Sequence, residues 1–137
     1  MTVPSTKILI VDDDPDIRAS LRTLLESQGY SVIGAQNGKK ALHYLTSDES
    51  MPDLIVLDLS MPELTGWELA SILARYTRLA SIPIVVVSSL TEHMHSIREL
   101  VAASVQKPVH SEALLKVVEH QIKRRQSLRD GAPPDRF

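Results

Sequence analysis

The feature of this sequence that most limits its fold is a fivefold alternation of short apolar runs with segments of helical period. Five residues mark these runs: Lys7, Ser31, Leu54, Pro83 and Val105. Runs that are apolar almost throughout, such as Ile8–Val11 and Ile84–Val87, are typical of strands buried on both faces. No hairpin signal joins one run to the next. The alternation therefore predicts an α/β fold, with a doubly wound, five-stranded parallel sheet, right-handed crossovers and helices on both faces.

Capping and turn residues predict where five helices lie. Asp14 suits the N-cap of the first helix, Pro15 its first position, and Gly29 its end. Asn37 and Gly38 are expected to open the second helix. The remaining three helices are predicted over residues 64–75, about 91–102, and 111 to about 125.

The chain of 137 residues has the length of one domain. We expect residues 1–126 to fold as that domain and residues 127–137, which are turn-forming and polar, to form a flexible tail. The formal net charge of −2 gives no general attraction to nucleic acid or to an anionic membrane, and the absence of cysteine excludes disulfides and thiolate zinc sites. No apolar run has the length of a membrane span or a secretory signal, so we expect the chain in the cytoplasm.

Polar side chains gather where the predicted strands end. Five residues occupy these ends: Asp12 and Asp13 after the first strand, Asp58 after the third, Ser88 after the fourth and Lys107 after the fifth. The carboxyl ends of parallel strands meet at one edge of a sheet, where ligands of such folds bind. Taken singly, each residue has an ordinary alternative as a helix cap or a solvated loop residue. Their conjunction at four strand ends predicts one binding site.

The residue types at this edge predict a metal-assisted reaction of phosphate. Carboxylates in close contact repel one another, and a hard divalent cation relieves the repulsion between Asp12, Asp13 and Asp58. Oxygen ligands of this kind suit Mg²⁺, which keeps open positions for phosphoryl oxygens. The Lys107 ammonium and the Ser88 hydroxyl can bind the remaining phosphoryl oxygens. The set therefore predicts a magnesium site that meets the requirements of phosphoryl transfer.

Four segments resemble, in order, the motifs of bacterial response-regulator receiver domains. They are Ile8–Arg18, Asp58–Gly66, Ile82–Ser89 and Lys107–Pro108. The resemblance extends from about Lys7 to Ile122, which is nearly the whole predicted domain. It implies the flavodoxin-like fold of the chemotaxis regulators, with strand order 2-1-3-4-5.

The resemblance also implies a role for each residue around the metal. Asp58 would be the nucleophile and phosphoacceptor. Asp13 would bind Mg²⁺ directly, Asp12 would act mainly through metal-bound water, and the carbonyl of Ser60 would complete the protein ligands.

Two further residues would act on the phosphoryl group, Ser88 through a hydrogen bond and Lys107 through its charge, aimed by a cis Lys107–Pro108 peptide. The implied donor is a phosphohistidine on a sensor histidine kinase or a histidine phosphotransfer protein. The domain would catalyse its own phosphorylation without being a conventional enzyme, and the aspartyl phosphate would later be hydrolysed with or without its assistance. We expect a monomer or weak dimer that signals to a protein partner which the sequence does not identify.

Three departures from the family pattern concern the surface that receivers use to signal. Ser104 stands where most receivers have an aromatic residue three positions before the lysine. The usual Gly-Ala is absent from the stretch 100–103. Ser88 and Lys107 lie 19 positions apart, about three fewer than in the family, which is nearly one helical turn. We therefore expect a shorter fourth helix and an atypical output surface beside an intact acidic pocket.

The sequence is also open to other interpretations. A haloacid-dehalogenase-type phosphatase needs a second aspartate two residues after Asp58, where Ser60 stands. A phosphorylation-independent binding module predicts losses among the site residues, and none is lost. A receiver excised from a larger regulator or hybrid kinase stays compatible with the polar tail. The basic residues near the end of the last helix fit a solvated helix terminus better than a nucleic-acid site.

Overall fold

The computed structural model describes residues 6–47, 51–59, 66–75, 81–88 and 101–129. Its centre is a five-stranded, all-parallel sheet in the order β2-β1-β3-β4-β5. The strands are β1 (Lys7–Val11), β2 (Ser31–Ala35), β3 (Leu54–Asp58), β4 (Ile84–Ser88) and β5 (Ala103–Gln106). The predicted fold class and strand order are both confirmed.

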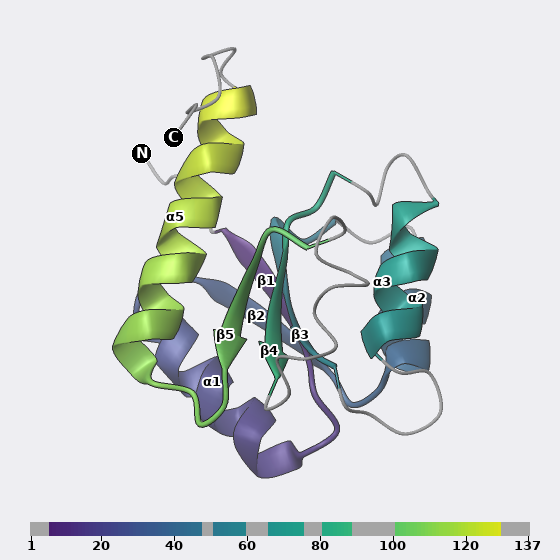
Figure 1. Cartoon of the computed structure of the whole chain (residues 1–137), viewed down its shortest axis with the longest axis horizontal. Coiled ribbons are helices and arrows are strands. Elements are labelled where there is room, and N and C mark those ends of the chain that lie inside the picture. The colour runs from purple at the N-terminus through teal and green to yellow at the C-terminus, as the bar shows by residue number, and fades with distance from the viewer. Residues whose placement is uncertain (1–5, 48–50, 60–65, 76–80, 89–100, 130–137) are drawn as a thin grey trace.

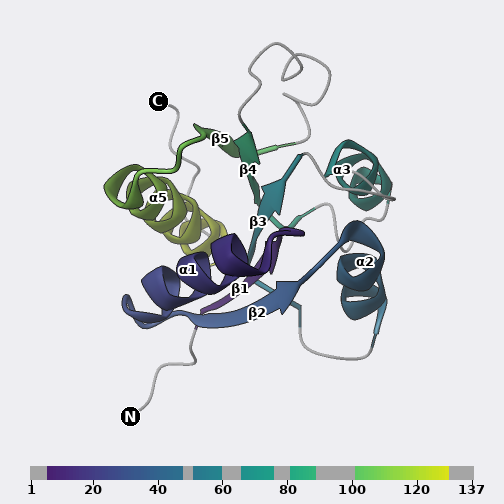
Figure 2. The ribbon, with the colours of Figure 1, turned by 90° about the horizontal axis from the view of Figure 1, so that it is seen from below.

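Four helices belong to the described residues and form two layers around the sheet (Figures 1 and 2). They are α1 (Pro15–Glu26), α2 (Gly38–Thr46), α3 (Gly66–Ala74) and α5 (Ser111–Arg129). Figure 2 shows α1 and α5 on one face of the sheet and α2 and α3 on the other. The helix predicted over about 91–102, and with it the expected shortening, lies almost wholly outside the described residues. No helix in the described ranges is both long and apolar enough to cross a membrane.

Local capping explains where α1 begins and ends. The Asp14 carboxylate accepts hydrogen bonds from the amides of Asp16 and Ile17, at 2.9 and 3.3 Å, and Pro15 takes the first helical position. After α1 the chain reverses at Gly29, whose φ of 92° lies in the region that favours glycine. These caps place the start of α1 directly after the end of β1, so the loop between them is short.

The core consists of two apolar clusters, one on each face of the sheet. Alternate residues of the central strands supply both clusters because successive side chains of a strand point to opposite faces. Leu9, Val11, Ile55, Leu57 and Val86 pack on the α2/α3 side, and Ile8, Ile10, Leu54, Val56, Val85 and Val87 pack on the α1/α5 side. Burial of each such side chain stabilises the fold by about 1.5–3 kcal/mol. This rigid sheet fixes the positions of the strand ends.

Helix α5 is longer than predicted and runs to Arg129 instead of ending near Arg125. The prediction ended the helix where the sequence becomes polar, but no glycine or proline follows until Gly131. Without a breaker, the helix continues through polar residues of adequate helical propensity. The helical part of the expected tail is thus residues 127–129, and the domain boundary at residue 126 stays a prediction.

Candidate functional site

The site lies at the carboxyl edge of the sheet, where β1 and β3 end side by side. The two strands are paired in parallel with Val11 opposite Leu57, so the residues that follow, Asp12 and Asp58, come together. Both side chains are buried, with Asp12 2% and Asp58 4% exposed. Asp13 is exposed, yet one carboxylate oxygen from each of the three aspartates lies within 4.8 Å of the others. The sheet register therefore builds the acidic cluster that the sequence predicts.

Asp12 is held from both its main chain and its side chain. Its amide donates to the carbonyl of Ala35 on β2, at 3.1 Å, which extends the strand pairing by one residue. Its carboxylate accepts from the amide of Asp14 at 2.9 Å. Burial raises the pKa of Asp12, and the nearby Asp58 and Asp13 carboxylates raise it further, against the lowering effects of the Asp14 amide and Lys107. The ionised form of Asp12 is thus disfavoured in this site, and a bound cation would stabilise it.

Lys107 places its ammonium group in contact with Asp58. Its Nζ lies 3.3 Å from Oδ1 of Asp58, and the lysine is about one quarter exposed. The amide of Lys107 donates to the carbonyl of Ser88 at 2.9 Å, which anchors the residue to the end of β4. The Lys107–Pro108 peptide is cis, as the resemblance implies.

Ser88 and Ser104 occupy different surroundings along the paired strands β4 and β5. Ser88 ends β4 one residue after Val87, which is paired with Asp58, so its backbone lies at the same edge as the acidic cluster. Ser104 pairs with Val86 further back in the sheet and is exposed. The residue that replaces the expected aromatic therefore stands on an exposed position of β5. Ser60 lies outside the described residues.

The charges in this site do not balance. Three carboxylates face one ammonium group within the contacts given above. All the donor atoms are hard oxygens, and two of the three carboxylates are shielded from solvent. Such a donor set suits a small divalent cation such as Mg²⁺ and is unsuited to softer metals, which prefer nitrogen or sulfur ligands. The residues present therefore fit a magnesium ion.

Comparison with known families settles what kind of domain carries this site. The family model described as "Response regulator receiver domain" matches residues 8–119. The chain belongs to this family. The match includes Asp12, Asp13, Asp58 and Lys107, and it extends over all five strands except Lys7 and over the first nine residues of α5.

Curated relatives place receiver domains of this kind in proteins of very different length. Protein PilH of Pseudomonas aeruginosa is 30% identical over 115 residues, which cover 82% of this chain and 93% of PilH. The sensor histidine kinase CheAY of Helicobacter pylori is 30% identical over 119 residues, covering 85% of this chain but 15% of the kinase. This receiver domain therefore resembles both short proteins and small parts of long ones.

Solved receiver structures share the fold closely. The chemotaxis protein CheY4 of Vibrio cholerae superposes with a TM-score of 0.78 at 28% identity, covering 85% of this chain and 98% of that one. The response regulator TrrA of Thermotoga maritima, solved in complex with Mg²⁺-BeF, gives a TM-score of 0.75 at 26% identity, covering 85% and 98%. The receiver fold is thus shown by sequence and by structure.

The structure brings together most of the predicted site and adds one residue to its surroundings. Asp12, Asp13, Asp58 and Lys107 meet as predicted from the strand ends. Arg18 was not predicted, yet its guanidinium donates to the carbonyl of Asp12 at 2.8 Å. The signal that could have revealed it is a glycine inside the predicted second strand, because such a glycine often marks a close approach of another group.

Proposed function

We propose that this receiver accepts a phosphoryl group from a phosphohistidine donor onto Asp58, in a magnesium-dependent phosphorelay of the two-component type. The observation that carries the proposal is the meeting of three carboxylates within 4.8 Å, with the ammonium of Lys107 3.3 Å from Asp58. A buried carboxylate beside a metal-binding pair and a cation has what phosphoryl transfer needs: a positioned nucleophile and neutralisation of charge.

Each residue has a distinct role in the proposed reaction. Asp12, Asp13 and Asp58 would hold Mg²⁺, together with the carbonyl that the family pattern assigns to Ser60. Bound there, the ion supplies positive charge that offsets the negative charge of the phosphoryl oxygens. An Asp58 oxygen attacks the phosphorus, the bond from phosphorus to the donor histidine breaks, and its electron pair returns to the imidazole, which takes up a proton.

Lys107 and Ser88 serve the transferred group. The Lys107 ammonium is paired with Asp58 before the reaction. It can pair with a phosphoryl oxygen afterwards, because the phosphoryl group would be attached to Asp58 itself. The Ser88 hydroxyl, on the neighbouring strand end, is assigned a hydrogen bond to a second phosphoryl oxygen. These groups would lower the barrier by stabilising charge where it develops.

The donor and the length of the whole protein form a second part of the proposal. A sensor histidine kinase or a histidine phosphotransfer protein would supply the phosphoryl group, in the cytoplasm. The near-complete coverage of PilH supports a stand-alone receiver, whereas the coverage of 15% of CheAY supports the alternative of a receiver within a hybrid kinase. In either case the exposed Ser104 on β5 supports an output surface without the usual aromatic switch.

The test is phosphorylation by a small donor. Acetyl phosphate and MgCl₂ are added to the wild type, Asp58→Ala and Asp53→Asn, and the intact mass is measured. Asp53 precedes the same strand at its other end and serves as the matched carboxylate control. We expect one phosphoryl addition in the wild type and in Asp53→Asn. It should not form when EDTA is present from the start, and it should be absent from Asp58→Ala. A phosphoryl group that persists in Asp58→Ala refutes the assignment.

A further inference from the structure

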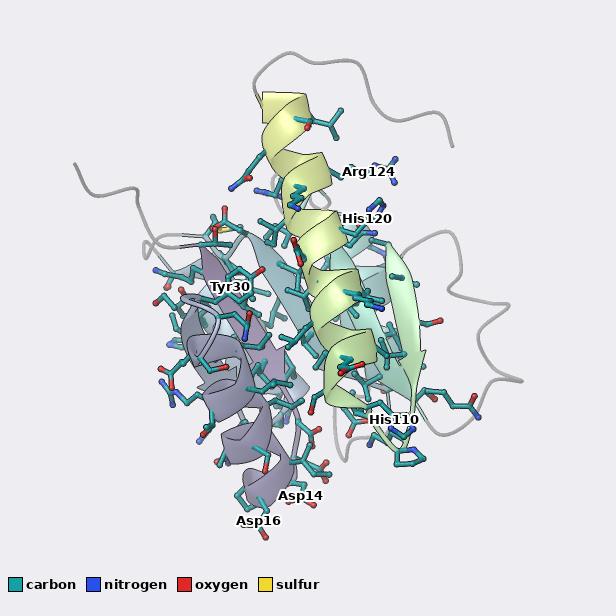
Figure 3. The ribbon with its side chains drawn as sticks, turned by 90° about the vertical axis from the view of Figure 1, so that its left-hand side faces the viewer. Asp14, Asp16, Tyr30, His110, His120 and Arg124 are labelled. Carbon is teal, nitrogen blue, oxygen red and sulfur yellow. The ribbon has the colours of Figure 1, made fainter. Side chains whose placement is uncertain are left out.

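Two arginines of helix α1 donate hydrogen bonds toward the sheet, and only one of them reaches the acidic loop. Arg22 donates to the carbonyl of Val32 at 3.0 Å. Arg18, one helical turn earlier, donates to the carbonyl of Asp12 at 2.8 Å. Figure 3 shows α1 from its outer side, with Asp14 at its first turn and Tyr30 beyond its other end. The two arginines have the same reach and the same type of acceptor, but Arg22 bonds the sheet and Arg18 bonds the loop that carries the carboxylates.

The bond from Arg18 completes the restraint of Asp12. The amide of Asp12 is used by Ala35, its side chain by the amide of Asp14, and its carbonyl by Arg18. The carbonyl belongs to the peptide unit that joins Asp12 to Asp13. Fixing that peptide restricts the direction in which the Asp13 side chain can extend. Asp13 is the one exposed member of the cluster.

Gly34 on β2 makes room for Arg18 to reach this carbonyl. A Cβ atom at Gly34 would lie 3.2 Å from Cδ of Arg18, which is tighter than ordinary van der Waals contact, and 3.4 Å from Cγ, at the limit of ordinary contact. The backbone offers no other reason for a glycine, since among the described glycines only Gly29 has a positive φ. The missing side chain therefore serves the passage of Arg18 and not a turn.

We propose that Arg18 is a positioning residue for the magnesium site, acting through the peptide between Asp12 and Asp13, and that Gly34 is the notch that admits it. This inference rests on the proposed function, because it assumes that the acidic cluster binds Mg²⁺. The sign of the expected effect separates positioning from charge. A cation near the cluster repels Mg²⁺, so removing Arg18 would tighten binding if charge alone mattered. Positioning predicts the opposite.

The test is a titration with MgCl₂ alone, followed by backbone amide NMR shifts, on the wild type, Arg18→Ala, Arg18→Lys and Gly34→Val. We expect Arg18→Ala to weaken Mg²⁺ binding about tenfold, in the range seen when groups that orient metal ligands are removed. Arg18→Lys keeps one hydrogen-bond donor, so its Mg²⁺ affinity should lie between those of the wild type and Arg18→Ala. Gly34→Val keeps Arg18 but blocks its path, so it should weaken binding as Arg18→Ala does.

Two controls separate positioning from general damage to the fold. Arg22→Ala removes the matched arginine and should leave Mg²⁺ affinity unchanged, and thermal unfolding in EDTA reports the stability of every variant. The double variant Arg18→Ala/Gly34→Val should bind Mg²⁺ no more weakly than either single variant, since both act on one contact. Fully additive losses would contradict a shared mechanism.

The outcomes distinguish failure of this inference from failure of the proposed function. Unchanged or tighter binding in Arg18→Ala, with a wild type that binds Mg²⁺ and is phosphorylated on Asp58, overturns the role of Arg18 alone. An equal loss of affinity in Arg22→Ala also overturns it, because the effect would then belong to α1 as a whole. A wild type that binds no Mg²⁺ overturns both proposals.

Discussion

Strand β3 has an aspartate at each end, and the two lie in opposite electrostatic situations. Before the strand, Asp53 accepts the amide of Lys7 at 2.9 Å and pairs with Arg125 of α5 at 3.8 Å. Arg125 also donates to the carbonyl of Ser81, at 2.8 Å, which connects α5 to the segment that precedes β4. At the other end, Asp58 pairs with Lys107 at 3.3 Å but shares its surroundings with two more carboxylates.

The comparison teaches that charge balance, and not burial or pairing, separates a functional ion pair from a structural one in this fold. At the Asp53 end one carboxylate faces one guanidinium and accepts a main-chain amide, so one negative and one positive charge are matched within the protein. At the Asp58 end an excess of negative charge is left for an external cation to neutralise. The same strand thus has a structural ion pair at one end and a binding site at the other.

The largest expected effect is on the rate of phosphorylation, when the cation at one end of β3 or the other is removed. Lys107→Ala should slow phosphorylation by acetyl phosphate about 10²–10³-fold, the usual cost of losing one group that stabilises charge in a transition state. Arg125→Ala should leave the rate unchanged, because Arg125 contacts the other end of the sheet. Intact-mass time courses at saturating Mg²⁺ measure both rates. Equal slowing in the two variants would remove the functional contrast between the ends.

The next effect concerns Mg²⁺ and pH. Magnesium at about a hundredfold above its Kd should raise the free energy of unfolding by about 2.7 kcal/mol at neutral pH. The pKa of Asp12 is raised by burial and by neighbouring carboxylates, so protons compete with Mg²⁺ at higher pH than for an ordinary aspartate. The stabilisation should therefore fade on acidification before ordinary aspartates titrate.

In EDTA, the pH dependence of the free energy of unfolding that Asp12 contributes has the opposite sign. Its raised folded-state pKa contributes stability that is fully present below the unfolded value and is lost as the pH rises through the folded value. Thermal unfolding with and without Mg²⁺ across the acid range, in the wild type and Asp12→Asn, checks both signs. A Mg²⁺ stabilisation that does not change with pH would contradict the competition.

A smaller effect is expected at the structural end. Arg125→Ala should lower the free energy of unfolding by about 2 kcal/mol, because it removes a charge-assisted hydrogen bond to Ser81 and the pairing with Asp53. The neighbouring Arg124 is exposed and labelled on the outer side of α5 in Figure 3. Arg124→Ala should therefore change stability by less than about 0.5 kcal/mol. Urea denaturation measures both, and equal losses would show that Arg125 has no special structural role.

The fold could be predicted from the sequence because its strongest signals are local. Runs such as Ile84–Val87 are long enough to identify central strands, and Asp14 with Pro15 identifies a helix start. The end of α5 was predicted wrongly, near Arg125 instead of Arg129, because helix propensity without a breaker leaves the end undefined. Parallel order followed from the absence of hairpins, and the order of strands from the family resemblance.

The site was predictable as far as it depends on strand ends. The pattern places Asp12 and Asp58 at strand ends, and the strand order that the resemblance implies makes β1 and β3 neighbours, so that the two residues meet. The contact of Arg18 with the Asp12 carbonyl depends on where α1 crosses β2, which no local pattern encodes. The pairing of Asp53 with Arg125 likewise depends on how α5 packs against the sheet. Residues that act through packing between elements were therefore the ones missed.

The smallest expected effect is the sharpest test of the comparison, because it predicts opposite signs for the same substitution. At Asp12, the neighbouring Asp58 carboxylate raises the pKa by more than Lys107 lowers it. Asp58→Asn should therefore relieve net repulsion and stabilise the protein in EDTA by about 0.5–1 kcal/mol. Asp53→Asn should destabilise it by about 1 kcal/mol, since its carboxylate has only favourable charged contacts among those described.

Urea denaturation in EDTA and again in MgCl₂ measures these changes. Magnesium should reverse the order of the wild type and Asp58→Asn, because the wild type keeps the full set of carboxylates and gains more from the ion. The deficit of Asp53→Asn relative to the wild type should be the same in both buffers, since Asp53 lies at the far end of β3. A loss of stability in Asp58→Asn in EDTA would mean that Lys107 already balances the cluster, and the distinction between the two ends of the strand would fall with it.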